Sequence, residues 1–429
     1  MIYNNFIKTE KHSLQNKCLI FFYICLPLVG VLDSRITNLL LFGLMLVLCV
    51  SDDFYLLFPA CIVYYSYLFV PFTGLSLYRA YSIIVLIKMF ARKKITFNKI
   101  PQVVQVAVLI LYMMLGVMFV NARTALFGIV DIVVVYLLIS KYMYKKDKSN
   151  FEKIIGLFAI ACAFSIITGT LNGNAMSLSY KISGNWRATN RFVGTFVDPN
   201  YCSFMYIFAI IGLLVLEPFK KIINRLLIIA LLVGIAMTIS FSGFIGLAII
   251  YVFYIVLTGK INIKHILMIG LIVCGILGLY WYGTVNTDAP IVGDIVYRVN
   301  SYILNYEGSS TGGMAVSRIT IYKNILLKFN AQGLFKQLFG MNTDIPAITQ
   351  SSILVAHNDY VDMMYNCGLI FTFIFYGVMF YRWLASCFKY IKTKDNRVAF
   401  IAISKFLWLY FAFTLTMLSE RTFYLCLFV

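Results

Sequence analysis

Charged residues are scarce in this sequence. Only 12% of its 429 residues are Asp, Glu, Lys or Arg, whereas soluble chains usually carry about 25%. The apolar share of 61% exceeds what a soluble domain of this length buries. Apolar runs of roughly 16–20 residues recur along the chain, which is long enough to cross a bilayer. Because the runs are continuous and do not alternate with polar residues, a transmembrane β-barrel is excluded.

The remaining class is an all-α, polytopic membrane protein with about 12–14 transmembrane helices and one long extracytoplasmic loop that contains helices. We expect spans at 18–32, 36–50, 54–72, 76–91, 102–120, 123–140, 154–170, 201–217, 222–240, 242–258, 265–283, 361–383 and 399–417, with a partial span at 422–429. The chain divides into N-terminal helices (1–170), a central membrane region with a first outer loop (171–283), a long outer loop (284–356) and C-terminal helices (357–429).

Acidic residues are also few, 17 against 36 Lys and Arg, so the net charge is +19. Most of the basic residues fall in alternate connections between the predicted spans. These connections are 1–17, 91–101, 141–153, 217–225, 259–264 and 381–397. With the N-terminus inside, they are cytoplasmic and obey the positive-inside rule. The basic excess therefore reflects membrane topology and implies no nucleic-acid partner.

Several signatures are absent. The sequence has no phosphate-cradling Gly-rich loop, no Cys-x-x-Cys pair and no Gly-x-Ser-x-Gly elbow, so ATP-driven transport within this chain is unsupported. The long outer loop has no Cys, and we expect packing, not disulfides, from the ten cysteines. No internal repeat of the kind common in transporters is visible.

The long outer loop is predicted to contain a helix at 315–329. Its apolar side chains recur at helical spacing, at Ile319, Tyr322, Leu326 and Phe329. Such a helix suits the surface of the outer leaflet. The alternative is a helix packed on other parts of the loop.

Of the three histidines, His12 and His265 are predicted to be cytoplasmic, and only His357 faces outward. One outward His is a reasonable general base for a hydroxyl nucleophile. Asp359 either caps the following helix or folds back to orient the His357 ring, and Tyr360 would share the histidine's face in a helix. A metal site would need further ligands, so we expect no metal or other cofactor.

The stretch "RFVGTFVDPN", residues 191–200, opens an apolar run. Asp198 is predicted to be the N-cap of the next helix and Pro199 its first residue. A helix N-terminus with an Arg fork beside it binds anions such as phosphate, which makes Arg191 a candidate ligand. Asn200 either supports the cap or contacts the same anion. The alternative, which would be the expectation for Arg191 considered by itself, is a side chain that extends to the lipid headgroups (snorkelling).

Three motifs in order resemble the O-antigen polymerase and ligase superfamily, over roughly residues 185–383. "RFVGTFVDPNYCSF" resembles its Arg-x-x-Gly-Thr-Phe-x-(Asp/Asn)-Pro-Asn element, and "SRITIYKNILLKF" before "LFG" resembles its Ser-Arg loop segment. "AHNDYVDMMYNCGLI" resembles its His-Asn-x-(Tyr/Phe) motif with a Gly-Leu-Ile helix. Many members also carry Ser-Arg-Gly where this chain has "SFSG", residues 240–243.

The resemblance implies an inverting, metal-independent membrane glycosyltransferase of the bacterial cytoplasmic (inner) membrane with its site on the periplasmic face. Donor and acceptor would be glycans on undecaprenyl diphosphate, and a chain-length regulator protein would be a further partner. His357 would act as base, with Asp359 or Tyr360 orienting it. The diphosphate ligands would be Arg191 and Arg318, with Asn200 as a further contact. The role of the arginine that "SFSG" lacks would fall on Arg187, Arg298 or Arg318.

Two other functions remain open. A ligase of the same family would move finished glycan to a lipid A core, and we favour a polymerase because polymerases are the more numerous members. A flippase or exporter of lipid-linked sugars would instead place charges deep in several spans and show pseudo-symmetry.

Overall fold

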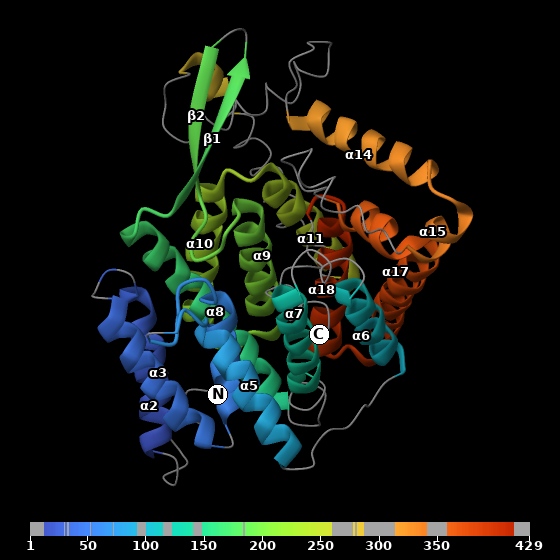
Figure 1. Cartoon of the computed structure of the whole chain (residues 1–429). Helices are drawn as coiled ribbons and strands as arrows, with labels where there is room; N and C mark the ends of the chain where they lie inside the picture. Colours follow the sequence, from blue (N-terminus) through green and yellow to red (C-terminus); the bar gives the residue numbers. More distant parts are fainter. Residues whose placement is uncertain are drawn as a thin grey trace.

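The computed structural model describes residues 13–29, 31, 34–51, 53–71, 73–91, 100–114, 122–139, 148–182, 185–259, 278, 281–286, 314–340 and 358–415. Its α-helices are α2 (Ser13–Cys25), α3 (Ser34–Val50), α4 (Phe58–Val63), α5 (Leu77–Ala91), α6 (Ile100–Tyr112), α7 (Ala122–Leu138), α8 (Lys148–Leu171), α9 (Pro199–Leu216), α10 (Lys221–Thr238), α11 (Phe241–Thr258), α14 (Met314–Asn330), α15 (Leu334–Phe339), α17 (Asp359–Thr393) and α18 (Asn396–Ala412). Two short 3-10 helices, η2 (Leu26–Leu28) and η3 (Phe54–Leu57), and two strands, β1 (Ala175–Ile182) and β2 (Asn185–Phe192), complete the described elements (Figure 1).

Over the residues that the structure describes, the chain is an all-α, multi-pass membrane protein apart from one hairpin. Within the described residues, α9, α10, α11, α17 and the part of α8 from Asn150 to Leu171 are long and apolar enough to cross a membrane. Shorter apolar helices occupy most of the other predicted spans. The predicted spans at 265–283 and 422–429 lie largely or wholly outside the described residues.

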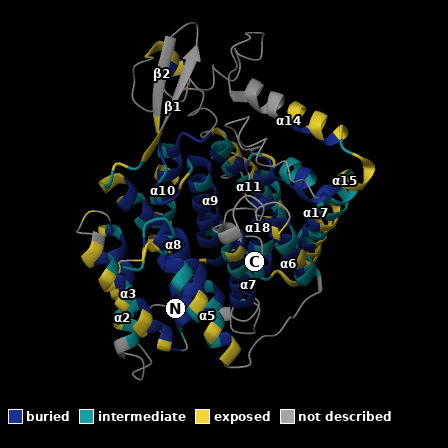
Figure 2. Cartoon of the chain, viewed as in Figure 1, coloured by how far each residue is buried: buried dark blue, intermediate teal, exposed yellow. Residues whose placement is uncertain are grey.

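Helix α9 forms the centre of the bundle and is dark blue along its length in Figure 2. It packs against α8, α10, α11 and α18. Aromatic contacts hold it in place: the Phe208 ring lies edge-on to Phe158 of α8, with centroids 5.4 Å apart, and is tilted against Phe400 of α18, with centroids 5.2 Å apart. By contrast, only 28% of α10 and of α11 is buried inside the protein, as expected for helices that face lipid.

The prediction of a continuous transmembrane helix at 54–72 is wrong. The chain there makes the buried helices η3 and α4 and then turns at residues 64–67, before a bridge between Phe69 and Ser76. Irregular backbone at membrane depth requires polar partners from the protein. The Thr195 hydroxyl donates to the Val63 carbonyl at 2.8 Å. A residue of the first outer loop therefore provides the hydrogen-bond partner for the last carbonyl of α4.

The first outer loop contains a β-hairpin that the sequence did not predict. Strands β1 and β2 pair antiparallel, with Met176 opposite Arg191 and Ile182 opposite Asn185. In Figure 1 the hairpin projects from the same end of the bundle at which α14 lies. We call this the outer end.

Helix α17 is broken near its outer end. Gly368 has φ 79° and ψ 172°, so two helices meet there. The last residues of α15 pack into the break: a Cβ on Gly368 would lie 2.5 Å from the Gly340 amide nitrogen, and one on Gly340 would lie 2.7 Å from the Cys367 Cα. The two backbones touch because neither glycine has a side chain. The "LFG" and "GLI" motifs are therefore in direct contact.

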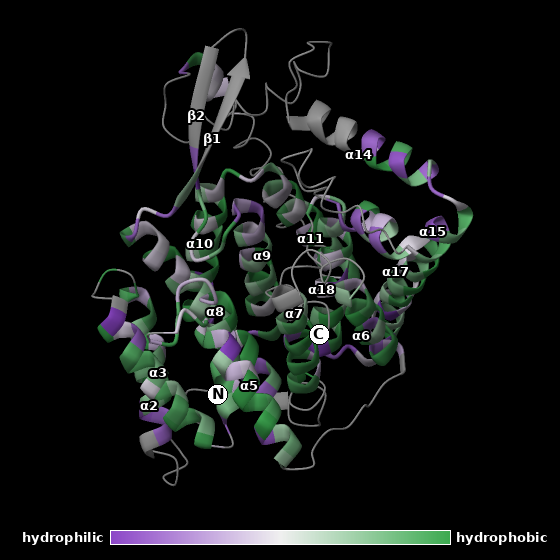
Figure 3. Cartoon of the chain, in the orientation of Figure 1, coloured by the Kyte–Doolittle hydropathy of each residue, from purple (hydrophilic) through white to green (hydrophobic). Residues whose placement is uncertain are grey.

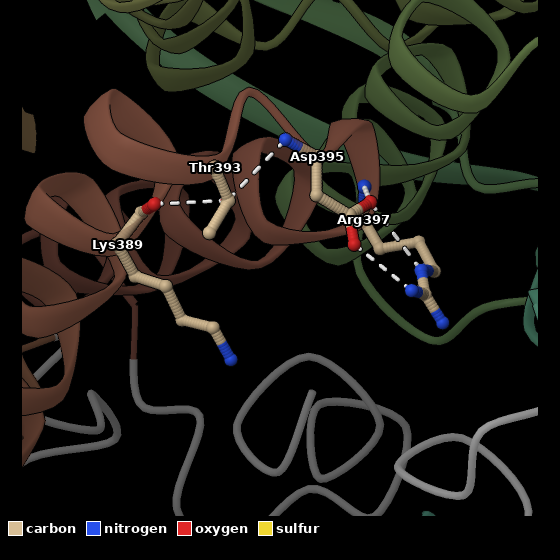
Figure 4. A network of polar contacts seen from close by, with 4 residues as sticks. All are labelled: Lys389, Thr393, Asp395 and Arg397. Atoms are coloured by element: carbon tan, nitrogen blue, oxygen red, sulfur yellow. Dashed lines mark hydrogen bonds and ion pairs between the residues drawn. The ribbon is translucent and has the colours of Figure 1, made fainter.

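At the opposite end, α17 and α18 are joined by a tight turn, which Figure 4 shows. Lys394 takes a left-handed φ of 50°, and Asp395 caps α18 by accepting from the Arg397 amide at 2.9 Å. The Arg397 guanidinium also pairs with Asp395 at 2.9 Å. Basic residues gather in this turn, as the positive-inside rule expects of a cytoplasmic connection.

We predict that Gly368→Ala destabilises the protein by about 3 kcal/mol or more. Alanine pays for a backbone conformation nearly exclusive to glycine, and its methyl group overlaps α15. Gly377→Ala, in the same helix with open space around the Cβ position, is the control and should be neutral or up to about 1 kcal/mol stabilising. Denaturant midpoints in detergent measure both, and equal midpoints for the two variants would refute the assigned contact.

Candidate functional site

Arg191 lies at the base of β2 and is 2% exposed. Its Nε donates to the Thr238 carbonyl at 3.2 Å, and a terminal guanidinium nitrogen donates to the Asn200 Oδ1 at 3.2 Å. Thr238 ends α10 and Asn200 is in the first turn of α9. The guanidinium is therefore directed into protein and not toward lipid headgroups, against the snorkelling alternative.

A connected set of buried polar side chains surrounds Arg191. The Asn200 Oδ1 also accepts from the Ser240 hydroxyl at 2.6 Å, and the Ser203 and Thr238 hydroxyls share a hydrogen bond of 2.7 Å. We call the five residues the Arg191 cluster; all are at most 6% exposed. Buried polar groups must be hydrogen-bonded, and here the side chains satisfy one another.

Two helix N-termini meet at this cluster. Asp198 is the N-cap of α9, as predicted, and its Oδ1 accepts from the Asn200 and Tyr201 amides at 2.7 and 3.4 Å. Ser240 is the N-cap of α11 and accepts from the Gly243 amide at 3.1 Å. Helix N-termini carry partial positive charge. The Asp198 carboxylate offsets this charge at the start of α9, so the positive region at the outer end consists of the Arg191 guanidinium and the N-terminus of α11.

The "SFSG" departure falls inside this region. Ser240 stands where many members of the resembled family begin Ser-Arg-Gly, and its hydroxyl reaches the same amide oxygen as Arg191. Gly243 lets α11 approach α9, because a Cβ there would lie 2.7 Å from the Ser203 side chain. The sequence did not single out Ser203 and Thr238 as members of this site. The only signal for them was a Ser or Thr near the ends of consecutive apolar runs.

Gly194 of the "RFVG" turn lies against protein. Its φ is +59°, and a Cβ on Gly169 of α8 would lie 2.7 Å from the Gly194 Cα. The turn after β2 is thereby packed onto α8, which fixes where the hairpin emerges. The glycine at this turn thus admits a neighbouring helix.

The start of α17 holds the other predicted residues. Asn358, not Asp359, is the N-cap, because the Asn358 Oδ1 accepts from the Val361 amide at 3.2 Å. The capping prediction for Asp359 was thus wrong by one residue, since Asn caps a helix as well as Asp does. Asp359 is fully buried. His357 itself lies outside the described residues.

Tyr360 is held in place by its surroundings. Its hydroxyl donates to the Leu409 carbonyl at 3.1 Å, and its ring stacks on Tyr376 with centroids 4.0 Å apart. One contact was not foreseen: the Tyr112 hydroxyl of α6 donates to Asp362 at 2.7 Å. It fastens the outer part of α17 to α6.

The outer end of α18 joins the two regions. The Asp359 amide donates to the Leu415 carbonyl at 3.1 Å, and the Tyr410 hydroxyl donates to the Ser242 carbonyl at 3.2 Å. Residues 409–415 therefore contact both the start of α17 and the start of α11. The first and third motifs are linked through one helix end.

The two remaining predicted ligands are placed by their backbones alone. Arg187 pairs with Tyr180 in the hairpin and lies four residues before Arg191, about 13 Å toward the tip. Arg318 is in the first half of α14. The described residues contain no group of three or more His, Cys, Asp or Glu side chains placed to hold a metal.

Buried charges also occur deeper in the bundle. Asp131 of α7, Arg382 of α17 and Lys405 of α18 are at most 8% exposed. Arg382 donates to the Gln105 side-chain oxygen of α6. Ionisable residues inside a membrane bundle are costly and are retained for structure or for a transport path.

We predict that Asn200→Ala destabilises the protein by about 1–3 kcal/mol, because Arg191 and Ser240 lose their shared acceptor. Asn200→Asp keeps an acceptor oxygen and should retain most of the stability through a charge-assisted bond. Thermal unfolding in detergent compares the two. Equal losses would show that the shared hydrogen bonds do not stabilise the fold.

Comparison with known proteins adds no assignment: no protein-family model matches the chain, and no curated protein matches it. The resemblance carried by the three motifs stays a prediction.

Proposed function

We propose that this chain is an inverting, metal-independent membrane glycosyltransferase that polymerises undecaprenyl-diphosphate-linked oligosaccharide repeat units at the outer face of a bacterial cytoplasmic membrane. The observation that carries the proposal is the Arg191 cluster. A buried guanidinium lies where the N-termini of α9 and α11 converge, at the end of the bundle that the basic connections assign to the outside.

In the proposed reaction the donor's diphosphate binds at this positive region. The acceptor sugar hydroxyl attacks the anomeric carbon, a new carbon–oxygen bond forms, and the bond from that carbon to the diphosphate oxygen breaks. Negative charge grows on the leaving undecaprenyl diphosphate. Arg191 and the N-terminus of α11 stabilise that charge, a task that preorganised donors perform without a metal. Arg187 and Arg318 are the further proposed diphosphate contacts.

His357 accepts the proton of the attacking hydroxyl in this proposal. It precedes Asn358, whose φ of −158° is extended, so the helix begins only after the histidine. Asp359 takes the orienting role, because the Tyr360 hydroxyl donates to the Leu409 carbonyl instead. The contacts of α18 with the starts of α11 and α17 support a base and an anion site held in one fixed relation.

Transport of lipid-linked sugars is the second candidate. The buried Asp131, Arg382 and Lys405 favour it, because such charges line transport paths. A transporter would move repeat units across a membrane without lengthening them, so product length separates the two functions.

The direct test is polymerisation by purified protein given lipid-diphosphate-linked repeat unit, without metal or nucleotide. We expect wild type to give longer glycans, and Arg191→Ala to lose on the order of 10²–10³ in rate. His357→Ala should be inactive. Arg225→Ala, an exposed arginine at the opposite end of α10, is the matched control and should retain full rate. A normal rate for Arg191→Ala would refute its assigned role in diphosphate binding, and a normal rate for His357→Ala would refute its assigned role as the base.

The Asn200→Asp variant tests diphosphate binding separately from folding. The variant is expected to fold, since the carboxylate still accepts from Arg191 and Ser240. A negative charge beside the diphosphate should nevertheless lower donor turnover on the order of 10²-fold, because juxtaposed like charges cost several kcal/mol. A folded Asn200→Asp protein with normal turnover would place the diphosphate elsewhere.

A further inference from the structure

The second half of α14 packs one face onto α17. Ile325 and Phe329 are 6% and 5% exposed, and they form a small apolar cluster with Tyr365. Figure 1 shows α14 lying across the outer end of the bundle and α15 returning to α17. Helix α14 is thus anchored to the membrane bundle. Neither of the two expectations from the sequence, a helix on the outer leaflet or one packed on other parts of the loop, included this contact.

A second face of α14 and the adjoining α15 remain uncovered. Leu326 and Leu327 are 42% and 58% exposed, and Leu334 and Phe335 of α15 are 70% and 62% exposed. We call these four residues the apolar edge. The same region is coloured as exposed in Figure 2, and the coloured half of α14 alternates hydrophobic and hydrophilic residues in Figure 3. An apolar patch of this kind marks a site of interaction.

The charge around the apolar edge has one sign. Residues 314–340 contain Arg318, Lys323, Lys328 and Lys336 and no Asp or Glu. Lys323 is three and four residues before Leu326 and Leu327, so it shares their face. Lys328 is five residues from Lys323 and lies on a different face.

Aromatic contacts connect the apolar edge to the lipid-facing surface of α17. The ring of Phe335 lies 5.0 Å from Phe339, which lies 6.5 Å from Phe371 of α17. Ile374, three residues on and therefore on the same face as Phe371, is 38% exposed. The apolar edge therefore continues the surface that α17 presents to the acyl chains.

We propose that the apolar edge docks into the outer leaflet of the bilayer, with Lys323 and Lys336 on anionic phospholipid headgroups. The leucines and Phe335 enter the boundary between headgroups and acyl chains, as in interfacial amphipathic helices, and the lysine stems extend so that their ammonium groups stay at the headgroups. Docking does not depend on the chemistry of the Arg191 cluster.

The test places the photo-crosslinking residue p-benzoylphenylalanine at Leu327, at Phe335 or, as control, at Lys328. The full-length protein is reconstituted into vesicles of phosphatidylethanolamine and phosphatidylglycerol, irradiated and examined by mass spectrometry. We expect lipid adducts several-fold more often at positions 327 and 335 than at 328. In a protein carrying the probe at 327, Lys323→Gln should lower the yield roughly fivefold, whereas Lys328→Gln should leave it unchanged.

Gel filtration confirms that each variant is folded. Equal yields at 327 and 328 would overturn the proposed orientation. Adducts to a second copy of the chain instead of lipid would make this edge a protein interface and overturn docking. Equal yields in phosphatidylcholine vesicles, with no effect of Lys323→Gln, would overturn the role of anionic headgroups.

Discussion

The outer end of this bundle depends on a buried guanidinium. A charge can be buried only with partners that replace its water, and Arg191 takes them from the end of α10 and the beginning of α9. Because Asn200 is shared with Ser240, the N-cap of α11 is tied to the same group. One side chain from the hairpin thereby fixes three helix ends. The positive region that this creates is a consequence of how the bundle is closed at its outer end.

The second half of the outer end is organised by backbone contact. Gly340 and Gly368 bring α15 into the break of α17, so the long outer loop returns to the bundle at one defined point. The break leaves a short helix before it, whose first amide donates to the Leu415 carbonyl. Since α18 also reaches α11 through Tyr410, Asp359, two residues after His357, and the residues beside Arg191 belong to one connected framework.

Much of this fold was predictable from hydropathy, because a span must be long and apolar. The N-cap at Asp198 was predictable from local capping chemistry and is confirmed. The turns after α4 and the break at Gly368 were not, because each is stabilised by a residue distant in sequence: Thr195 bonds to Val63, and Gly340 packs against Gly368. The hairpin was also missed, although its two strands are adjacent in sequence and pair with each other. Arg191 was recognised as a candidate from its motif, but its acceptors, Thr238 and Asn200, are brought together only by helix packing. Asp359 was misassigned by one position because Asn and Asp cap equally well.

The central claim is that the Arg191 cluster binds a lipid diphosphate. Native mass spectrometry of the purified protein with undecaprenyl diphosphate, and with undecaprenol as the phosphate-free control, tests it most directly. The account predicts that wild type binds the diphosphate far more tightly than the alcohol, and that Arg191→Gln loses this preference while binding the alcohol normally. An Arg191→Gln protein that retains the full preference for the diphosphate would contradict it.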